Sequence, residues 1–155
     1  MSEQIKEIRT ELTIVSILLV EHRMLREMME AMSDWIMSGI SIRAMQERAH
    51  VISVALDTHA RREEQELFNM LSSRSPAARH LVDMMELVHQ EVRDLFEEIE
   101  TASDPVSRMW TILEMTEAHF VREEQEVFPL AEQLLTAQEL ARPEPSFEEL
   151  AHQAT

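Results

Sequence analysis

The chain contains no cysteine and only one glycine among its 155 residues. Without cysteine there is no disulfide, no thiolate metal site and no thiol catalysis, so any bound metal must use nitrogen and oxygen ligands. Glycine is scarce, and good helix formers dominate the composition: Leu, Met, Glu, Ala, Gln and Arg. We therefore expect an all-α fold.

Positive charge is also scarce, because 14 Lys and Arg face 30 Asp and Glu, a formal net charge of −16. Nucleic acids and anionic membranes recruit basic side chains, so neither is expected as a partner. The longest apolar run near the N-terminus, IVSILLV (14–20), is too short to span a bilayer. The first ten residues are polar and unlike a signal peptide, so we expect a cytoplasmic protein.

Three turn signals divide the chain into helical segments of about residues 4–37, 42–72, 76–101 and 105–137. The turns are marked by Gly39 and Ser41, by Ser75 and Pro76, and by Asp104 and Pro105. Short connections predict an antiparallel up-down-up-down four-helix bundle in residues 1–140. Residues 141–155 are predicted to be an acidic, Pro-containing extension. Its SFEE motif (146–149) resembles a capping box, so this C-terminal extension forms either a short helix or a disordered end.

One polar decapeptide occurs twice, as HARREEQELF (59–68) and HFVREEQEVF (119–128). The apolar stripe of each predicted helix includes one histidine: His22, His59, His89 or His119. At about 100° per residue, the glutamate four positions after His59 or His119 lies about 40° away on the same face. These glutamates are Glu63 and Glu123. Four imidazoles and two carboxylates are thus expected to point into the middle of the bundle.

These six polar side chains would make a poor core if their only partners were one another. A single inward histidine is more often a core residue than a ligand, but a buried carboxylate without a partner is costly. A multivalent cation removes that cost, so we predict a metal site. Its ligands are His22, His59, Glu63, His89, His119 and Glu123. Six nitrogen and oxygen ligands suit iron or manganese in a dinuclear site with bridging carboxylates, and exceed the four of a structural zinc.

The remaining histidines are not assigned to the site. His50 and His80 each precede an inward histidine by nine residues, about 180° round a helix, and should face outward. His152 lies in the C-terminal extension.

The other glutamates of the two decapeptides differ in the direction in which they are expected to point from the helix. Glu64 and Glu124 are expected to point into solvent. Glu66 and Glu126 fall near the inner face, either as acceptors for the outer N–H groups of ligand histidines or as solvated or salt-bridged side chains.

Four aromatic residues are expected to face away from the site: Trp35, Phe68, Trp110 and Phe128. Outward aromatics either pack beneath a terminal segment or form a helix-face interface, so the chain is expected to be a monomer or a homodimer. Pro129 is expected to kink the last helix near its end.

The segments VEHRML (20–25), HARREEQELF, LVHQEV (87–92) and HFVREEQEVFP resemble the ligand helices of the hemerythrin-like (HHE cation-binding) family. The resemblance covers about residues 10–137. It implies a four-helix bundle around a non-haem di-iron centre, often with an oxo or hydroxo bridge; manganese and zinc are less expected. The four histidines would be terminal ligands, and Glu63 and Glu123 would bridge the ions.

The chain departs from oxygen-carrying members of that family. They have a His-x-x-x-His pair on the third helix, whereas Met85 and Arg93 flank His89 here, and the bridge on the fourth helix is Glu123 rather than an Asp-type motif. The resemblance implies binding of O₂ or a related small ligand such as NO or peroxide. The alternatives are a redox enzyme that detoxifies NO or peroxide, and iron storage or donation for iron-centre repair. The sequence leaves open whether the protein is an enzyme.

Overall fold

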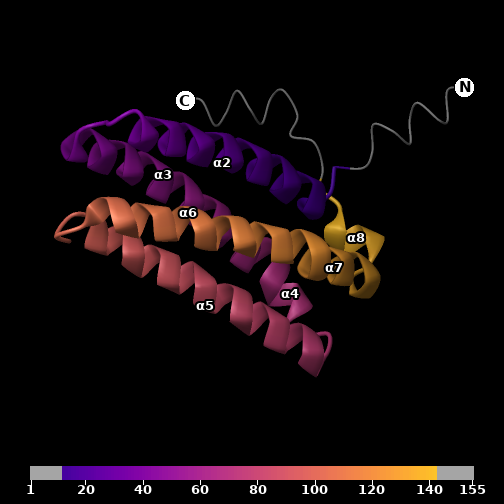
Figure 1. The fold of residues 1–155 in the computed structure, drawn as a ribbon. Helices are drawn as coiled ribbons and strands as arrows, with labels where there is room; N and C mark the ends of the chain where they lie inside the picture. The colour runs from indigo at the N-terminus through magenta and orange to yellow at the C-terminus, as the bar shows by residue number, and fades with distance from the viewer. Residues whose placement is uncertain (1–11, 143–155) are drawn as a thin grey trace, which may run out of the picture.

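The computed structural model of this chain describes residues 12–142. Within that range it is all-helical and contains no strand. Four long helical segments lie side by side and form a helical bundle (Figure 1). Among the described residues, no helix combines the length and the apolar character that a membrane span requires.

The first segment is α2 (Ile14–Met37), which begins later than predicted. Thr13 is its N-cap, and the side chains of Thr13 and Ser16 each accept a backbone N–H of the other residue in a capping box. The helix predicted from residue 4 therefore starts at Ile14, and residues 4–11 lie outside the described range. Gly39 follows the helix with φ of 80°, a left-handed conformation that glycine adopts without steric cost, so its predicted role is confirmed.

The other predicted helix starts are confirmed. Ser41 caps α3 (Ile42–Glu63), Ser75 caps α5 (Pro76–Ile99), and Asp104 caps α6 (Pro105–Arg122). In each case the side-chain oxygen accepts the backbone N–H of the residue three positions later. Pro76 and Pro105 occupy the first turn, where no intrahelical N–H is needed.

The second and fourth segments are interrupted by π-helical turns, which the sequence did not predict. A π-turn η1 (Glu64–Phe68) follows α3 and leads into α4 (Asn69–Leu71). A second π-turn η2 (Glu123–Val127) follows α6 and leads into α7 (Phe128–Leu134). Both π-turns lie within the repeated decapeptide.

The π-turns correct the predicted direction of two aromatic side chains. An unbroken α-helix would place Phe68 about 180° from His59. A π-turn holds more residues per turn, so the residues beyond it are rotated relative to the preceding α-helix. As a result Phe68 and Phe128 lie in the core, with 0% and 2% of their surface exposed, and the prediction that they face outward is wrong.

The fourth segment ends at Leu134 rather than at residue 137. Pro129 lies in the first turn of α7, directly after η2, so the interruption near it is a π-turn rather than a simple proline kink. A short helix α8 (Ala137–Leu140) follows, and the backbone N–H of Arg142 donates to Leu12 beside the start of α2. The predicted capping motif at 146–149 lies outside the described residues.

The apolar core forms two clusters with a polar layer between them. Along α2, Ile14 and Leu18 belong to one cluster, Leu25 and Met32 belong to the other, and the buried His22 lies between. The other predicted ligands lie at the same level of the bundle. The two clusters therefore enclose these polar groups from both ends of the bundle.

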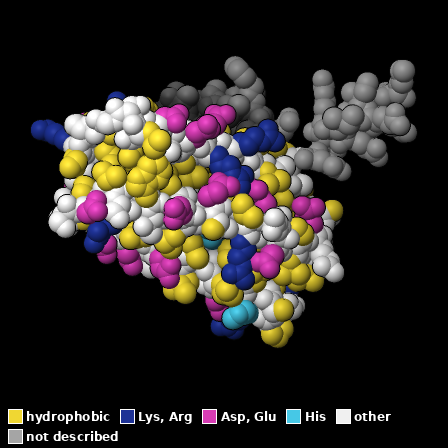
Figure 2. All heavy atoms as spheres, viewed as in Figure 1, with side chains coloured by type: hydrophobic (Ala, Val, Ile, Leu, Met, Phe, Trp, Pro, Cys, Tyr) yellow, Lys and Arg dark blue, Asp and Glu magenta, His cyan; other side chains and the backbone are white. Residues whose placement is uncertain are grey.

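The surface carries mixed charge. On the face in Figure 2, acidic and basic side chains are interspersed over the middle of the molecule, and hydrophobic side chains gather toward the end where α2 turns into α3. Trp35 is 36% exposed with the Arg48 guanidinium 4.2 Å from its ring centre, and Trp110 is half-buried. Since Phe68 and Phe128 are buried, the aromatic interface predicted for a homodimer loses two of its four members.

Candidate metal centre

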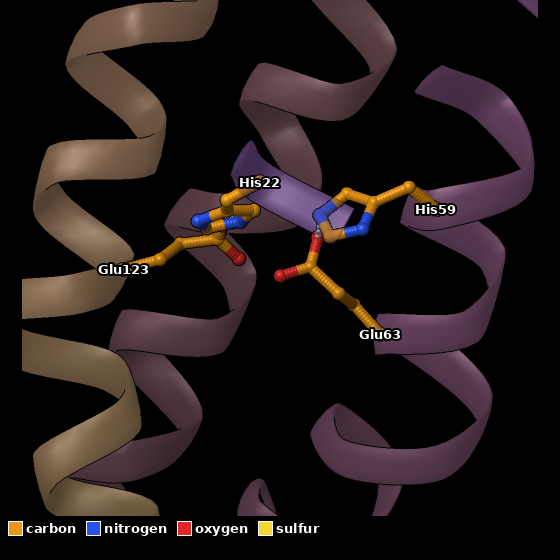
Figure 3. A group of neighbouring side chains, drawn as sticks. All are labelled: His22, His59, Glu63 and Glu123. Carbon is orange, nitrogen blue, oxygen red and sulfur yellow. Dashed lines mark ion pairs between the residues drawn. The ribbon is translucent and has the colours of Figure 1, made fainter. Parts of the chain in front are cut away.

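The structure brings all six predicted metal-site residues together in the middle of the bundle. The six are His22 on α2, His59 and Glu63 on α3, His89 on α5, His119 on α6, and Glu123, the first residue of η2. All are buried, and both glutamates have 0% of their surface exposed. Figure 3 shows His22, His59, Glu63 and Glu123 pointing toward one another, with His59 and Glu63 on the same helix.

Each glutamate lies between two imidazoles. The Glu63 Oε1 atom is 3.2 Å from His59 Nε2 and 3.3 Å from His89 Nε2. The two imidazoles of α5 and α6 also meet, because His89 Nε2 is 3.0 Å from His119 Nε2.

The Glu123 carboxylate repeats this arrangement on the other side. Its Oε1 atom is 3.1 Å from His119 Nε2 and 3.3 Å from His22 Nε2. Two atoms bound to one ion at about 2.1 Å and at right angles are about 3 Å apart. The observed separations are therefore those of ligands that share an ion.

The ligand atoms divide into two groups within which all atoms lie within 4.8 Å of one another. One group is His22, His59, Glu63 and Glu123; the other is Glu63, His89, His119 and Glu123. Both glutamates belong to both groups. Each group could hold a metal ion, and the two groups would share both carboxylates.

The hydrogen bonding of these residues also fits a cation. Eight of their side-chain atoms are buried without a hydrogen-bond partner: His22 Nε2, His59 Nε2, His89 Nδ1, His119 Nδ1 and both carboxylate oxygens of Glu63 and Glu123. Buried polar atoms are normally paired, because leaving them unpaired is costly. A cation at the centre would satisfy six of the eight, the four carboxylate oxygens and the Nε2 atoms of His22 and His59.

Burial controls the ionisation of the two glutamates. It raises the pKa of Glu63 well above its ordinary value, and the adjacent Glu123 carboxylate raises it further. Burial also acts to raise the pKa of Glu123, but the Glu63 carboxyl and the imidazoles of His119 and His22 lower it well below its ordinary value. Without a cation, this favours a proton on Glu63 beside an ionised Glu123. A bound cation would take the place of that proton.

His89 is held neutral. Burial and the neighbouring His119 lower its pKa from 6.5 to about 3, against the opposing effect of Glu123. A neutral imidazole is the form that binds a metal, so this side chain is ready to coordinate at physiological pH.

Carboxylates outside the cluster orient two of the histidines. The His22 Nδ1 atom is 2.7 Å from Glu124 Oε2, which also accepts a hydrogen bond of 2.7 Å from Arg26. The His59 Nδ1 atom is 2.8 Å from Glu21 Oε1. Each carboxylate would accept the outer N–H and so turn the Nε2 lone pair toward the centre.

The predicted direction of Glu64 and Glu124 is therefore corrected, and for Glu66 and Glu126 the structure shows the salt-bridged alternative. Glu124 does not point into solvent but braces His22. Glu64 lies 3.5 Å from His89 Nδ1 and accepts from Arg93 at 3.2 Å. Glu66 pairs with Arg142, and the exposed Glu126 pairs with Arg122, so neither reaches a ligand histidine.

The reason for this error is geometrical. The outer nitrogen of an inward imidazole faces the seam between two helices, and the acceptor comes from the neighbouring helix. Angles measured on a single helix cannot find such a partner. A signal does exist in the sequence, because Arg26 and Arg93 each follow an inward histidine by four residues, and Glu21 directly precedes His22.

A cleft of about 540 Å³ opens between α3 and α5 and reaches the centre. Three ligand residues, His59, His89 and His119, line it. Thr116 and Phe120 of α6 also line it, and both are buried. The cleft therefore gives a small molecule access to the polar layer.

The histidines left out of the site are placed as the sequence predicted, where the structure describes them. His50 and His80 are exposed, and His50 lines the cleft. His152 lies outside the described residues.

Comparison with protein families matches residues 13–131 to the hemerythrin HHE cation binding domain. The comparisons with curated proteins and with solved structures each found no significant match. The matched range contains all six residues of the cluster and both copies of the decapeptide.

Proposed function

The chain belongs to the hemerythrin HHE cation-binding family, and on that premise we propose that it holds two iron ions in an antiparallel up-down-up-down four-helix bundle. The observation that carries this proposal is that the two four-residue groups share both glutamates. In this arrangement His22 and His59 would hold one ion and His89 and His119 the other. Glu63 and Glu123 would be shared by both. The absence of thiolate and the balance of imidazole and carboxylate favour iron over zinc.

We propose that the centre binds O₂ or a related small ligand, NO or peroxide. A pair of iron ions supplies open coordination positions and up to two electrons to such a ligand. The protein holds the ligand atoms at fixed separations, orients His22 and His59 through Glu124 and Glu21, and covers the polar layer at both ends with two apolar clusters. The cleft between α3 and α5 brings the ligand to His89 and His119.

A second candidate function is turnover of NO or peroxide rather than reversible binding. The α5 helix supplies a single imidazole, because the positions four residues from His89 hold the buried Met85 and Arg93, which is paired with Asp57 and Glu64. A centre with fewer protein ligands has more open positions, and open positions favour reaction at the metal. Iron storage or donation remains a third candidate, marked by release of iron to an acceptor.

These functions are separated by one experiment. The protein is reconstituted anaerobically with ferrous iron, and its near-ultraviolet and visible spectrum is recorded after addition of O₂, NO or hydrogen peroxide. A lasting oxy spectrum that reverts to the ferrous form on removal of gas indicates reversible binding. Rapid oxidation with repeated consumption of NO or peroxide under a reductant indicates an enzyme. A spectrum that none of the three ligands changes would contradict the proposal.

A further inference from the structure

The cleft between α3 and α5 is much larger than a diatomic ligand requires. Its volume is about 540 Å³, whereas one water molecule occupies about 30 Å³ of liquid. Pockets of roughly 300–1,000 Å³ are typical of sites that bind organic molecules. The size of the cleft therefore points to a ligand with an organic group.

Part of the cleft wall is apolar and belongs to the cluster that contains Leu25 and Met32. Leu56 of α3 is 8% exposed, and Val92 and Phe96 of α5 are half-buried. All three line the cleft. Together they form a surface for an alkyl or aryl group, which gains free energy when it leaves water.

The outer rim of the cleft does not favour an anion. Its two arginines, Arg61 and Arg93, both pair with Asp57 at 2.7 Å. Glu97 and Glu100 line the same cleft and add negative charge. An uncharged ligand is therefore favoured over a carboxylate or a phosphate.

The inner part of the cleft holds one hydroxyl without a partner. Thr116 is 3% exposed, it lines the cleft, and its Oγ1 atom has no hydrogen-bond partner among the described residues. All other buried side-chain atoms without a partner in the described residues belong to the six predicted metal ligands. Thr116 lies one helical turn before His119, so a ligand at that histidine is close to a fixed hydrogen-bond donor.

We propose that this cleft binds an uncharged organic hydroperoxide, which it presents to the ions. The inference rests on the proposed function. Of the ligands proposed there, O₂ and NO have no position for an organic substituent, whereas a peroxide has one. The organic group lies on Leu56, Val92 and Phe96, and the Thr116 hydroxyl donates a hydrogen bond to a peroxide oxygen.

The reaction balances with the two ferrous ions as reductant. The O–O bond of the hydroperoxide breaks, each ferrous ion gives one electron, and two protons are taken up. The products are the alcohol, one water and two ferric ions. Thr116 positions the peroxide and is not consumed.

Binding is tested on the diferric protein with 2-phenyl-2-propanol, the alcohol product of cumene hydroperoxide. Isothermal titration calorimetry should show saturable binding, and Phe96→Trp should weaken it about tenfold by filling the cleft. Leu87→Trp is the matched control, because Leu87 is exposed on the same helix and does not line the cleft. Absence of binding to the wild-type protein would overturn the inference.

The reaction is tested by stopped-flow oxidation of the diferrous protein. Phe96→Trp should slow oxidation by cumene hydroperoxide about tenfold and leave oxidation by hydrogen peroxide within about twofold of wild type. Thr116→Val, with unchanged iron content, should slow oxidation by both peroxides. If hydrogen peroxide oxidises the centre but Phe96→Trp affects both oxidants equally, the organic subsite is wrong and the proposed function stands. If O₂, NO and both peroxides leave the diferrous protein unchanged, the proposed function itself fails.

Discussion

The two halves of the bundle repeat the same arrangement around the centre. In the first half His22 is followed by Arg26, and Glu124 lies between them. In the second half His89 is followed by Arg93, and Glu64 lies near both. Each glutamate comes from the π-turn of the opposite half. The repeated decapeptide thus supplies an inward ligand for its own half and an acceptor for the histidine of the other.

The halves differ in how firmly their imidazoles are held. The Nδ1 atoms of His22 and His59 lie within 2.8 Å of a carboxylate oxygen. In the second half Glu64 is 3.5 Å from His89 Nδ1, and His119 Nδ1 has no partner among residues 12–142.

One position accounts for part of this difference. Glu21 precedes His22 and braces His59, whereas Val88 stands at the corresponding place before His89. Valine offers no acceptor, and Val88 lines the cleft. We infer that the first half anchors its ion and that the second half exposes its ion to a ligand.

The largest loss of iron affinity is expected when a glutamate shared by the two halves is replaced. Glu63→Ala or Glu123→Ala removes a ligand shared by both groups, so both ions should be lost together. We expect the affinity for iron to fall more than about 100-fold, beyond the loss typical of an outer partner. Iron content after dialysis measures this.

Glu126→Gln is the control. Glu126 lies in the same π-turn as Glu123, but it is exposed and paired with Arg122. Retention of both ions by either alanine variant would contradict the bridging role of that glutamate.

Replacing one histidine in each half separates the two ions. His119→Leu should remove the ion of the second half, leave about one iron per chain, and abolish the spectral change with NO. His59→Leu should remove the more firmly held ion. Iron analysis and NO titration of the two variants are compared side by side. Equal loss of both properties in both variants would show that the halves are not distinct.

Replacing Glu21, whose carboxylate braces His59, should have a smaller effect on iron affinity. Glu21→Gln removes the charge that orients His59, and we expect about a tenfold loss of iron affinity in the first half. The exposed Glu27 on the same helix provides the control Glu27→Gln.

The reciprocal substitution introduces a carboxylate in the second half, at the position that corresponds to Glu21. Val88→Glu places an acid where the second half lacks one, and should slow loss of its ion during dialysis against a chelator. If Glu21→Gln behaves like Glu27→Gln, the carboxylate does not brace the histidine.

The last prediction concerns folding stability rather than iron affinity, as a pH dependence in the second half, measured on metal-free protein. The pKa of His89 is about 3 in the folded chain and near 6.5 when unfolded. Below pH 6.5 the unfolded chain takes up a proton that the folded chain does not, so the free energy of unfolding falls as the pH falls toward 3.

For one such group the slope approaches about 1.4 kcal/mol per pH unit. Urea unfolding at pH 7, 6 and 5 should show a dependence that steepens toward this slope as the pH falls below 6.5, and His89→Gln should reduce it. An equal slope in the variant would mean that His89 is not held neutral.

Patterns that repeat along one helix predicted much of this structure. Capping residues such as Ser75 and Asp104 located helix starts, because the signal for a cap lies within four residues. The six metal-site residues were found together, because inward direction follows from the 3.6-residue period over the α-helical stretches up to Glu63 and Glu123. Local regularity was sufficient for both.

The sequence failed where that regularity ends or where a partner comes from another helix. The π-turns that begin at Glu64 and Glu123 change the direction in which the following side chains point. Phe68 and Phe128 were therefore predicted to face outward, although they are in the core. Glu124 was assigned to solvent because its partner, His22, is 102 positions away in the chain. Such contacts depend on how helices pack, which the period of one helix does not determine.

The central claim is that one chain holds a coupled pair of ions between its two halves. Iron analysis combined with electron paramagnetic resonance of the oxidised, reconstituted protein tests it most directly. We predict two iron ions per chain with no signal from isolated ferric ions, because bridged ferric ions couple to a state with no net spin. One ion or fewer per chain, or two ions that each give an isolated ferric signal, would contradict the account.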